Sequence, residues 1–408
     1  MMSAHSCHRS SVCVNKTSYR APSSCRRHGR RSVNASATLL SCSSGSTFLS
    51  ESQKAALHET ALLIARPGKG ISACDEGPGT VGSRFEAVGV ANSEETRRVY
   101  RQMLFTPRAA DYLSAVILDP ETLYQKNDDG EAFPAALSAM GVVPGVKPHL
   151  KVYELPGQNG NTVMQGLDSL AARCKEYYNA GARFAKWRSP INIDVSNGQP
   201  SQLIIDTNML DLARYALICQ SEGLCPIVEP DISLTGDHTL EDAVAINIKV
   251  QSALYHAMLE HGVYMEGTTL KPNIVNPGKS CATSYSVEEI AQANLDVFAR
   301  CFPTAMPGAN YLSGGQSLED AAARLSMINK MKQPNHPWNI SFSWSAAIQL
   351  PILDLCKGKG GELPLEEMEQ LYIDELKIAS DASLGQYEPP AGASDGAHVG
   401  VREKATVA

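Results

Sequence analysis

The chain has 408 residues, 43% of them hydrophobic and 19% charged, which is the composition of one large globular domain or two ordinary ones. No apolar stretch approaches the roughly 18 residues of a membrane-spanning helix, so the sequence predicts no such helix. The net charge is −7, and without the basic first fifty residues it falls to about −14. Neither nucleic acid nor an anionic membrane is therefore an expected partner.

The first fifty residues differ in composition from the rest of the chain. They contain seven Lys and Arg residues, many serines, no acidic residue before Glu51 and no continuous apolar segment of the kind found in secretory signals. A basic, serine-rich and acid-free start is typical of an organellar transit peptide. We predict such a peptide over residues 1–45, and the abundance of hydroxyl residues favours the chloroplast stroma. A basic arm that binds nucleic acid is the alternative.

From about residue 50, short β-branched strands alternate with amphipathic helices. The predicted strands cover residues 70–75, 114–119, 142–147, 183–187, 225–229, 265–271, 309–313 and 339–344. Eight strands that alternate with helices, without a break in composition, predict a single α/β domain, a (β/α)8 TIM barrel, over residues 46–387. A doubly wound sheet is the alternative. It is disfavoured because no G-x-G-x-x-G turn follows the first strand and no phosphate loop of the form G-x-x-x-x-G-K-[ST] occurs.

Local signals mark several helix starts and one turn. Thr239, with Glu241 and Asp242 after it, opens one predicted helix, and the capping box that begins at Ser286 opens another. A further helix is expected over residues 365–384, and a flexible C-terminal tail over residues 388–408. Residues 127–130 (NDDG) lack the alternating ligands and distal Glu of a calcium loop, and therefore predict a turn.

The most informative residue is Lys271, which closes the apolar run 265–271 and is followed by Pro272. A buried ammonium at the end of a strand is costly unless it is paired or has lost its proton. Desolvation lowers the pKa of a lysine and leaves a neutral amine that can attack a carbonyl. Taken alone, a lysine whose stem is buried and whose head reaches solvent is the more ordinary interpretation.

The ends of the other predicted strands favour the chemical interpretation. They carry Asp75, Lys147, Lys186, Arg188, Glu229, Asp231 and Ser313. In a barrel of parallel strands the carboxyl ends meet at one mouth, where such proteins carry their chemistry. We therefore expect these side chains to converge on one site.

The residue types at these ends suit carbonyl chemistry on an anionic substrate. Lys186 and Lys271 are expected to lie close together and to lower each other's pKa, which favours a free amine on one of them. Glu229 and Asp75 can accept and return protons as a carbinolamine forms and loses water.

The remaining polar residues at the predicted mouth suit phosphate binding. Ser313 and Gly314 follow the seventh strand, where these barrels often bind phosphate through backbone N–H groups. Lys147 and Arg188 add positive charge for an anionic substrate.

The chain resembles the class I fructose-1,6-bisphosphate aldolases, and with its basic start it resembles their plastid form. The matching stretches are residues 68–71 (GKGI), 122–126 (TLYQK), 184–188 (FAKWR), 226–230 (PIVEP), 270–273 (LKPN) and 312–317 (LSGGQS). The resemblance covers roughly residues 48–345 and, more loosely, 365–388. It implies reversible cleavage of fructose 1,6-bisphosphate to dihydroxyacetone phosphate and glyceraldehyde 3-phosphate, in glycolysis or the Calvin cycle.

The resemblance also implies roles for individual residues. Lys271 is expected to be the Schiff-base lysine, and Glu229 the acid and base for dehydration and carbon–carbon cleavage. Asp75 is expected to position the reacting hydroxyl with Lys186 as its cationic partner, and Asp231 belongs to the same catalytic set. The expected substrate-binding residues are Lys147, Arg188, Ser313, Gly314 and Arg84. No metal or cofactor is implied because the iminium is the electron sink, and a homotetramer is expected.

Four departures from the family pattern concern substrate binding and proton exchange. The family has an arginine after the eighth strand where this chain has Ala346, and its Asp-Glu-Ser becomes Asp75-Glu76-Gly77. Its Lys-Arg pair becomes Ser83-Arg84, and its C-terminal tyrosine is replaced by Ala408. Loss of a charge-assisted phosphate contact is expected to weaken binding by about 1.5–3 kcal/mol unless Arg84 serves the site.

These departures leave two alternative functions. One is an aldolase with a shifted sugar-phosphate preference. The other is a non-catalytic binding or scaffold subunit, which is disfavoured because such a protein has no need of costly buried charges at four strand ends.

Overall fold

The computed structural model describes residues 48–389. The predicted transit peptide, and the predicted tail from residue 390 onward, lie outside the described residues. Within the described part, no helix is long and apolar enough to cross a membrane.

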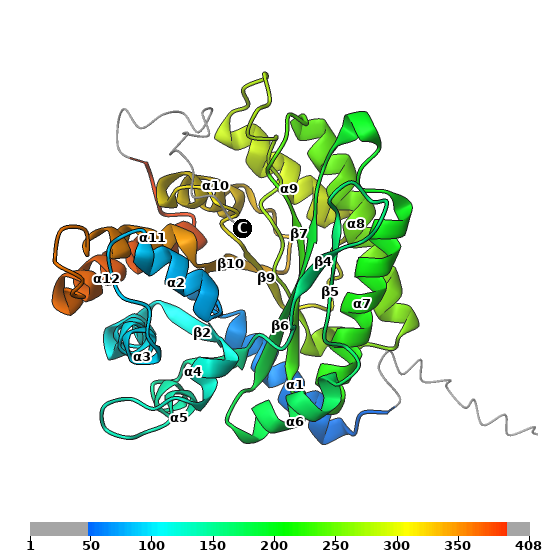
Figure 1. Cartoon of the computed structure of the whole chain (residues 1–408). Helices are drawn as coiled ribbons and strands as arrows, with labels where there is room; N and C mark the ends of the chain where they lie inside the picture. The colour runs from blue at the N-terminus through cyan, green and yellow to red at the C-terminus, as the bar shows by residue number, and fades with distance from the viewer. Residues whose placement is uncertain (1–47, 390–408) are drawn as a thin grey trace, which may run out of the picture. The chain divides into compact units, whose positions relative to one another are not determined.

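Eight parallel strands form a closed barrel, with helices arranged around them (Figure 1). The strands are β1 (Gly70–Cys74), β2 (Leu113–Leu118), β3 (Val143–Val146), β6 (Phe184–Ile191), β7 (Cys225–Ile232), β8 (Thr269–Leu270), β9 (Gly308–Tyr311) and β10 (Asn339–Trp344). Their order around the barrel is β1-β10-β9-β8-β7-β6-β3-β2. The predicted (β/α)8 fold is confirmed, and each of the eight predicted strands overlaps a strand of the barrel.

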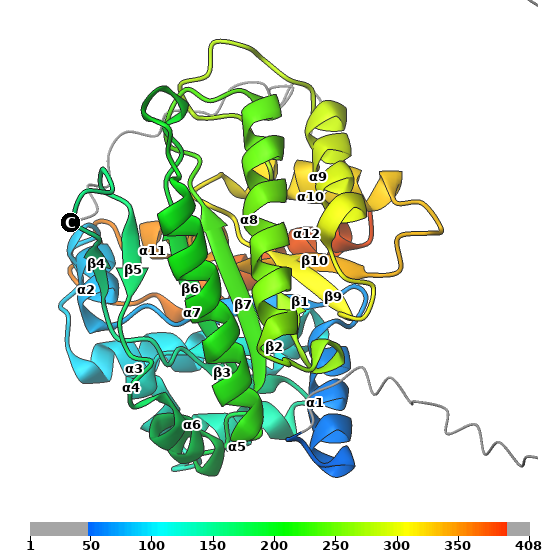
Figure 2. The same cartoon turned by 90° about the vertical axis from the view of Figure 1, so that its right-hand side faces the viewer.

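Twelve α-helices occur in residues 48–389, and their starts follow the local signals. They are α1 (Glu51–Ile64), α2 (Pro78–Glu86), α3 (Glu94–Leu104), α4 (Pro120–Tyr124), α5 (Phe133–Ala139), α6 (Leu170–Asn179), α7 (Gln202–Ser221), α8 (Leu240–Glu260), α9 (Val287–Cys301), α10 (Leu318–Met331), α11 (Ala346–Asp354) and α12 (Leu365–Ser383). Thr239 and Ser286 cap α8 and α9 in capping boxes, as expected. Figure 2 shows α7 and α8 side by side outside β6 and β7.

Two parts of the sheet structure differ from the sequence prediction. The predicted strand 265–271 is wrong in its first half, because Met265–Gly267 forms a 3-10 helix. Gly267 packs so closely on α1 that an added Cβ would lie 2.7 Å from Leu57 Cβ, and the chain turns here to pass that helix. The antiparallel hairpin of β4 (Val152–Glu154) and β5 (Thr162–Met164) was not predicted, because its strands are three residues long and β4 is exposed.

The lower part of the barrel interior is a separate apolar core that α1 closes. Its members are Leu49, Leu57, Ala61, Ile64, Ile71, Ala73, Ala115, Ile117, Val143, Phe184, Cys225 and Ile227. Successive side chains of a strand point to opposite faces, so the residue two positions later points inward again. Asp75 follows Ala73 in this way, Lys186 follows Phe184, and Glu229 follows Ile227. The strand period therefore places a layer of charge directly above the apolar core.

Candidate active site

Four charged side chains, from four different strands of the barrel or the residues just after them, meet in this layer. Glu229 lies between two lysines, with Oε1 3.3 Å from Lys271 Nζ and Oε2 2.9 Å from Lys186 Nζ. Lys186 Nζ also lies 2.7 Å from Asp75 Oδ2. The four side chains are 4–12% exposed. Two cations and two anions balance, which is the condition under which charges are tolerated inside a protein.

The expectation that the two lysines lower each other's pKa is wrong for Lys186. Burial alone would lower the pKa of Lys186, but the carboxylates of Asp75 and Glu229 outweigh it and raise the pKa above its ordinary value. The barrel order explains this, because β7 lies between β6 and β8 and brings Glu229 between the lysines. Lys186 is therefore a fixed cation.

Asp75 is held as an anion by the same cluster. Burial would raise its pKa, but Lys186, Lys271 and Lys147 outweigh burial and hold the pKa well below its usual range. A carboxyl group with so low a pKa donates no proton near neutral pH. Asp75 is therefore suited to orient a hydroxyl rather than to act as the acid that the sequence analysis allowed.

Of the two buried lysines, Lys271 is held less tightly by acidic groups. It has a single carboxylate contact, at 3.3 Å, whereas Lys186 has two shorter ones. The geometry therefore favours Lys271 as the amine that passes its proton to Glu229 and attacks a carbonyl. Glu229 is within reach to receive that proton and to return it later.

Lys147, Arg188 and Asp231 lie beside this cluster. Lys147 Nζ donates to the Asp75 backbone carbonyl at 2.5 Å and pairs with Asp119 Oδ2 at 3.0 Å. Arg188 Nε lies 2.6 Å from Asp231 Oδ2, and the Arg188 side chain is 48% exposed. Asp231 thus joins the site through Arg188. The strands β6 and β7 extend to Ile191 and Ile232. Lys186 and Glu229 therefore lie inside these strands, and the prediction that they lie at the strand ends is wrong.

On the other side of Lys271, the segment after β9 forms a backbone loop suited to an anion. Ser313 is buried, and Gly314 and Gly315 have φ angles of 59° and 75°, in the left-handed region that glycine adopts at low cost. Successive N–H groups in such turns can face one anion. Lys279 Nζ lies 3.5 Å from the Gly315 carbonyl oxygen. Lys279 was not among the predicted substrate-binding residues, because it lies in an irregular segment without a motif.

Arg84 lies at the edge of the mouth, close to Ala346, the position at which the family has its arginine after β10. Its Nη1 is 3.1 Å from Glu76 Oε1 and donates to Ser345 Oγ at 3.3 Å, one residue before Ala346. Glu76 also pairs with Arg101, at 3.2 Å. Two guanidinium groups therefore share one carboxylate, which leaves one positive charge uncompensated within this group.

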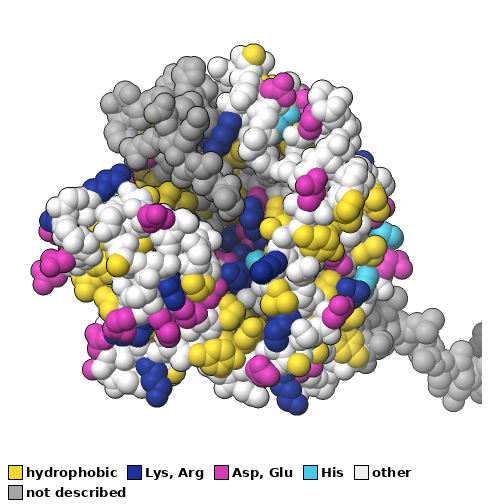
Figure 3. Space-filling view, in the orientation of Figure 1, with side chains coloured by type: hydrophobic (Ala, Val, Ile, Leu, Met, Phe, Trp, Pro, Cys, Tyr) yellow, Lys and Arg dark blue, Asp and Glu magenta, His cyan; other side chains and the backbone are white. Residues whose placement is uncertain are grey.

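The face of the barrel that carries these residues is basic. Figure 3 shows Lys and Arg side chains, with a histidine beside them, gathered in the hollow at the centre of this view. Across residues 48–389 no group of three or more His, Cys, Asp or Glu has the arrangement of a metal site. The arrangement combines a candidate amine nucleophile with an acid–base carboxyl and positive charge for an anionic substrate.

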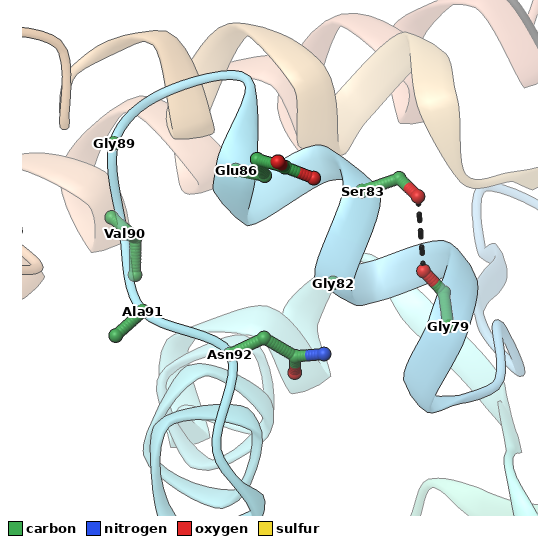
Figure 4. Close-up of a pocket in the computed structure, with 8 residues that line it drawn as sticks. All are labelled: Gly79, Gly82, Ser83, Glu86, Gly89, Val90, Ala91 and Asn92. Atoms are coloured by element: carbon green, nitrogen blue, oxygen red, sulfur yellow. Dashed lines mark hydrogen bonds between the residues drawn. The ribbon is translucent and has the colours of Figure 1, made fainter.

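A surface hollow of about 550 Å³ lies on α2 and the segment after it (Figure 4). It is lined by Gly79, Gly82, Ser83, Glu86, Gly89, Val90, Ala91 and Asn92, and Ser83 Oγ donates to the Gly79 carbonyl at 3.2 Å. None of these lining residues belongs to the charged cluster. The buried cluster, and not this hollow, is the candidate site.

The chain is similar to known proteins of one family. Residues 56–405 match the family model described as fructose-bisphosphate aldolase class-I. The chain is 46% identical to the fructose-bisphosphate aldolase of Echinococcus multilocularis over 81% of this chain and 91% of that protein. It is 44% identical to the cytosolic fructose-bisphosphate aldolase 4 of Arabidopsis thaliana, over 83% and 86% of the two chains. The solved structure of the Plasmodium falciparum aldolase in complex with TRAP and an inhibitor is similar, with a TM-score of 0.81, 36% identity and coverage of 85% and 99%.

Proposed function

This chain belongs to the class I fructose-bisphosphate aldolase family and has its glycolytic activity, and we propose that it cleaves its substrate through a Schiff base on Lys271. In the proposed reaction, Lys271 Nζ attacks the C2 ketone, and Glu229 protonates the carbinolamine hydroxyl, which leaves as water. Glu229, now a carboxylate, accepts the proton of the C4 hydroxyl as the C3–C4 bond breaks, and C4 leaves as the aldehyde of glyceraldehyde 3-phosphate. The electron pair of the broken bond moves to the iminium to form an enamine. Protonation at C3 and hydrolysis release dihydroxyacetone phosphate and restore the lysine.

The observation that carries this proposal is the position of the Glu229 carboxyl between Lys271 and Lys186. It is 3.3 Å from the candidate nucleophile, which is within range for proton transfer once substrate closes the site. Lys186 remains cationic beside it and stabilises the negative charge that develops at the C4 oxygen. Asp75, paired with Lys186 at 2.7 Å, orients the hydroxyl.

The order of the strands supports a bisphosphate lying across the mouth. The loop of Ser313 and Gly314 follows β9, which is the neighbour of β8 on one side of Lys271. Lys147 follows β3 and Arg188 lies on β6, and both strands are on the opposite side of β8, separated from it by β7. C1 of the sugar is one bond from the ketone carbon, and C6 is four carbons away. We assign the 1-phosphate to the Ser313 loop and the 6-phosphate to the side of Lys147 and Arg188.

The experiment that tests the Schiff base is reductive trapping. Borohydride added with dihydroxyacetone phosphate is expected to attach the ligand covalently to Lys271, and peptide mapping locates the adduct. An adduct on Lys186, or no adduct while the enzyme is active, overturns the assignment. EDTA is expected to leave the activity unchanged.

Restoring an arginine after β10 is expected to strengthen phosphate binding. Ala346→Arg should lower the KM for fructose 1,6-bisphosphate about tenfold, and the gain should fade at high ionic strength. The double variant with Trp344→Tyr is the fairer test, because Trp344 is fully buried beside this position. The KM for fructose 1,6-bisphosphate is measured for both variants and for the parent at low and high ionic strength. If neither variant changes KM and the parent already binds bisphosphates well, Arg84 binds the phosphate that the family arginine binds. The hypothesis of weakened phosphate binding, and with it the alternative of a shifted substrate preference, is then wrong.

We propose that residues 1–45 direct the enzyme to the plastid. The segment is basic, rich in serine and free of acidic residues, and the family match begins only at residue 56. Fused to a fluorescent protein, residues 1–45 should bring it to the plastid, whereas residues 46–90 fused in the same way should leave it diffuse. A cytosolic or nuclear signal from the first fusion contradicts the proposal and favours the basic arm.

We also propose a homotetramer, as the family resemblance implies. Sedimentation equilibrium of the protein lacking residues 1–45 should give four times the mass of one chain. A monomeric mass at micromolar concentration contradicts it.

A further inference from the structure

His149 lies two residues beyond Lys147, in the segment that leads from β3 into the hairpin of β4 and β5. The next residue, Leu150, is fixed by a hydrogen bond from its N–H to the Gln165 carbonyl at 3.0 Å. The His149 ring packs edge-on against the Trp187 ring, with centroids 5.8 Å apart and an angle of 72°. The backbone and this ring contact together hold the imidazole in one place at the β3 and β6 side of the mouth.

Both ring nitrogens of His149 are buried, and neither has a hydrogen-bond partner among residues 48–389. A neutral imidazole carries one N–H donor and one acceptor nitrogen. Buried polar atoms without partners are uncommon and costly, and each requires an explanation. A ligand that brings an acceptor oxygen to this side of the mouth supplies the partner that the N–H lacks, and protonation turns the second nitrogen into a donor as well.

Charged groups surround this imidazole, and most of them are positive. Lys186 and Arg188 on β6, and Lys147 after β3, act on the ring electrostatically as cations, and Asp75 after β1 acts on it as an anion. Burial, followed by the lysines, lowers the pKa of His149 well below its ordinary value, and Asp75 offsets this only in part. The ring is therefore neutral in the free enzyme at neutral pH, in a site that already holds the cations assigned to the 6-phosphate.

We propose that His149 is a specificity-determining residue of this aldolase that binds the 6-phosphate and takes up one proton from solvent as the dianion enters. The imidazolium then donates a hydrogen bond from one ring nitrogen to a phosphate oxygen, and no covalent bond forms or breaks. This role rests on the proposed function and deepens it, because it assigns a titrating donor to the phosphate that fructose 1-phosphate lacks. A phosphate dianion beside the ring attracts the imidazolium and so raises the pKa of His149, whereas the lysines repel the imidazolium and lower this pKa.

The direction of the pH dependence follows from this linkage. A group whose pKa is higher in the complex than in the free enzyme strengthens binding as the pH falls through the range between the two values. The KM for fructose 1,6-bisphosphate should therefore fall, relative to that for fructose 1-phosphate, as the pH is lowered from 8 to 6.5. Phosphate protonation is common to all variants and cancels in the comparison between them.

Three variants separate phosphate binding from ring packing. His149→Phe keeps a ring against Trp187 without nitrogens, and it should raise the bisphosphate KM about tenfold relative to the fructose 1-phosphate KM. His149→Gln keeps an N–H donor that does not titrate, and it should restore part of the affinity without the pH dependence. His256→Gln, at an exposed position on α8, is the matched control and should change neither KM.

Proton uptake gives an independent readout. Calorimetry of hexitol 1,6-bisphosphate, which has no carbonyl to cleave, is run at pH 7.5 in buffers of different ionisation enthalpy. The wild type should take up more protons than His149→Phe. Adding the same probe at pH 7 should move the His149 Cε1–H resonance of the wild-type enzyme toward its protonated position.

The outcomes are distinguishable. A wild-type enzyme that cleaves no bisphosphate and gives no borohydride adduct contradicts the proposed function itself. An active enzyme in which both His149 variants keep the wild-type ratio of KM values overturns the role of His149 and leaves it as a packing residue. If the variants do not fold, a His149 resonance in the wild type that does not respond to the probe overturns it equally.

Discussion

Replacing Lys271 by methionine is expected to lower kcat by a factor of roughly 10⁴ or more, because loss of the covalent nucleophile removes the whole Schiff-base route. Lys186 cannot take over the role. It pairs with two carboxylates, at 2.7 and 2.9 Å, that hold it as a cation. Borohydride should then trap no ligand. Kinetics of fructose 1,6-bisphosphate cleavage, with mass spectrometry of the reduced protein, measure both effects.

The Lys271→Met variant is expected to fold. Glu229 keeps Lys186 as a partner, so no isolated buried charge remains, although the cluster then carries one excess negative charge. Lys249→Met removes a lysine from the exposed face of α8 and is the matched control, with unchanged activity expected. A folded Lys271→Met protein that keeps 1% of the activity, or that still yields a reduced adduct, places the nucleophile elsewhere.

The barrel and its helix starts could be predicted because their signals are local. The strands are short, largely buried runs between turns, and the capping boxes at Thr239 and Ser286 form hydrogen bonds within a few residues of the chain. The 3-10 helix Met265–Gly267 could not be predicted in this way. Its Gly267 packs against Leu57 of α1, which is some two hundred residues earlier in the sequence and meets Gly267 only in the folded chain.

The members of the site were predictable from strand period, but their partners were not. Lys186, Glu229 and Lys271 were identified as residues of one mouth, and the four-charge cluster with Asp75 confirms that they meet. Which of them touch depends on the order of neighbouring strands, and the prediction that the two lysines lower each other's pKa did not take into account β7, which lies between them. The acidic neighbours in the folded chain, and not the residue type, hold Lys186 as a cation.

His149 illustrates a signal that was present and not used. It follows Lys147 by two positions, which is the strand spacing that also relates Arg188 to Lys186 and Asp231 to Glu229. Had the period been extended past the predicted strand end, His149 would have joined the candidate list. That its two nitrogens lack partners in the described part of the chain is visible only in the folded structure.

Replacing Glu229 by glutamine is expected to lower kcat by about 10²–10⁴, the usual contribution of a positioned acid and base. The amide keeps the shape of the side chain but cannot accept the Lys271 proton or return one to the carbinolamine hydroxyl. Lys186 keeps its pair with Asp75, at 2.7 Å. Rapid-quench kinetics with borohydride should show a slowly formed adduct that is still on Lys271.

Glu375 on α12 provides the control for this substitution. It is also a buried glutamate, at 4% exposure, and burial, with Glu319 and Asp374 nearby, raises its pKa to about 8. Because Glu375 is largely protonated at pH 7, Glu375→Gln replaces one neutral side chain by another and should leave cleavage and adduct formation unchanged. If Glu229→Gln forms the adduct at the wild-type rate, its carboxyl takes no part in dehydration. Its place between two lysines would then serve only to balance their charge.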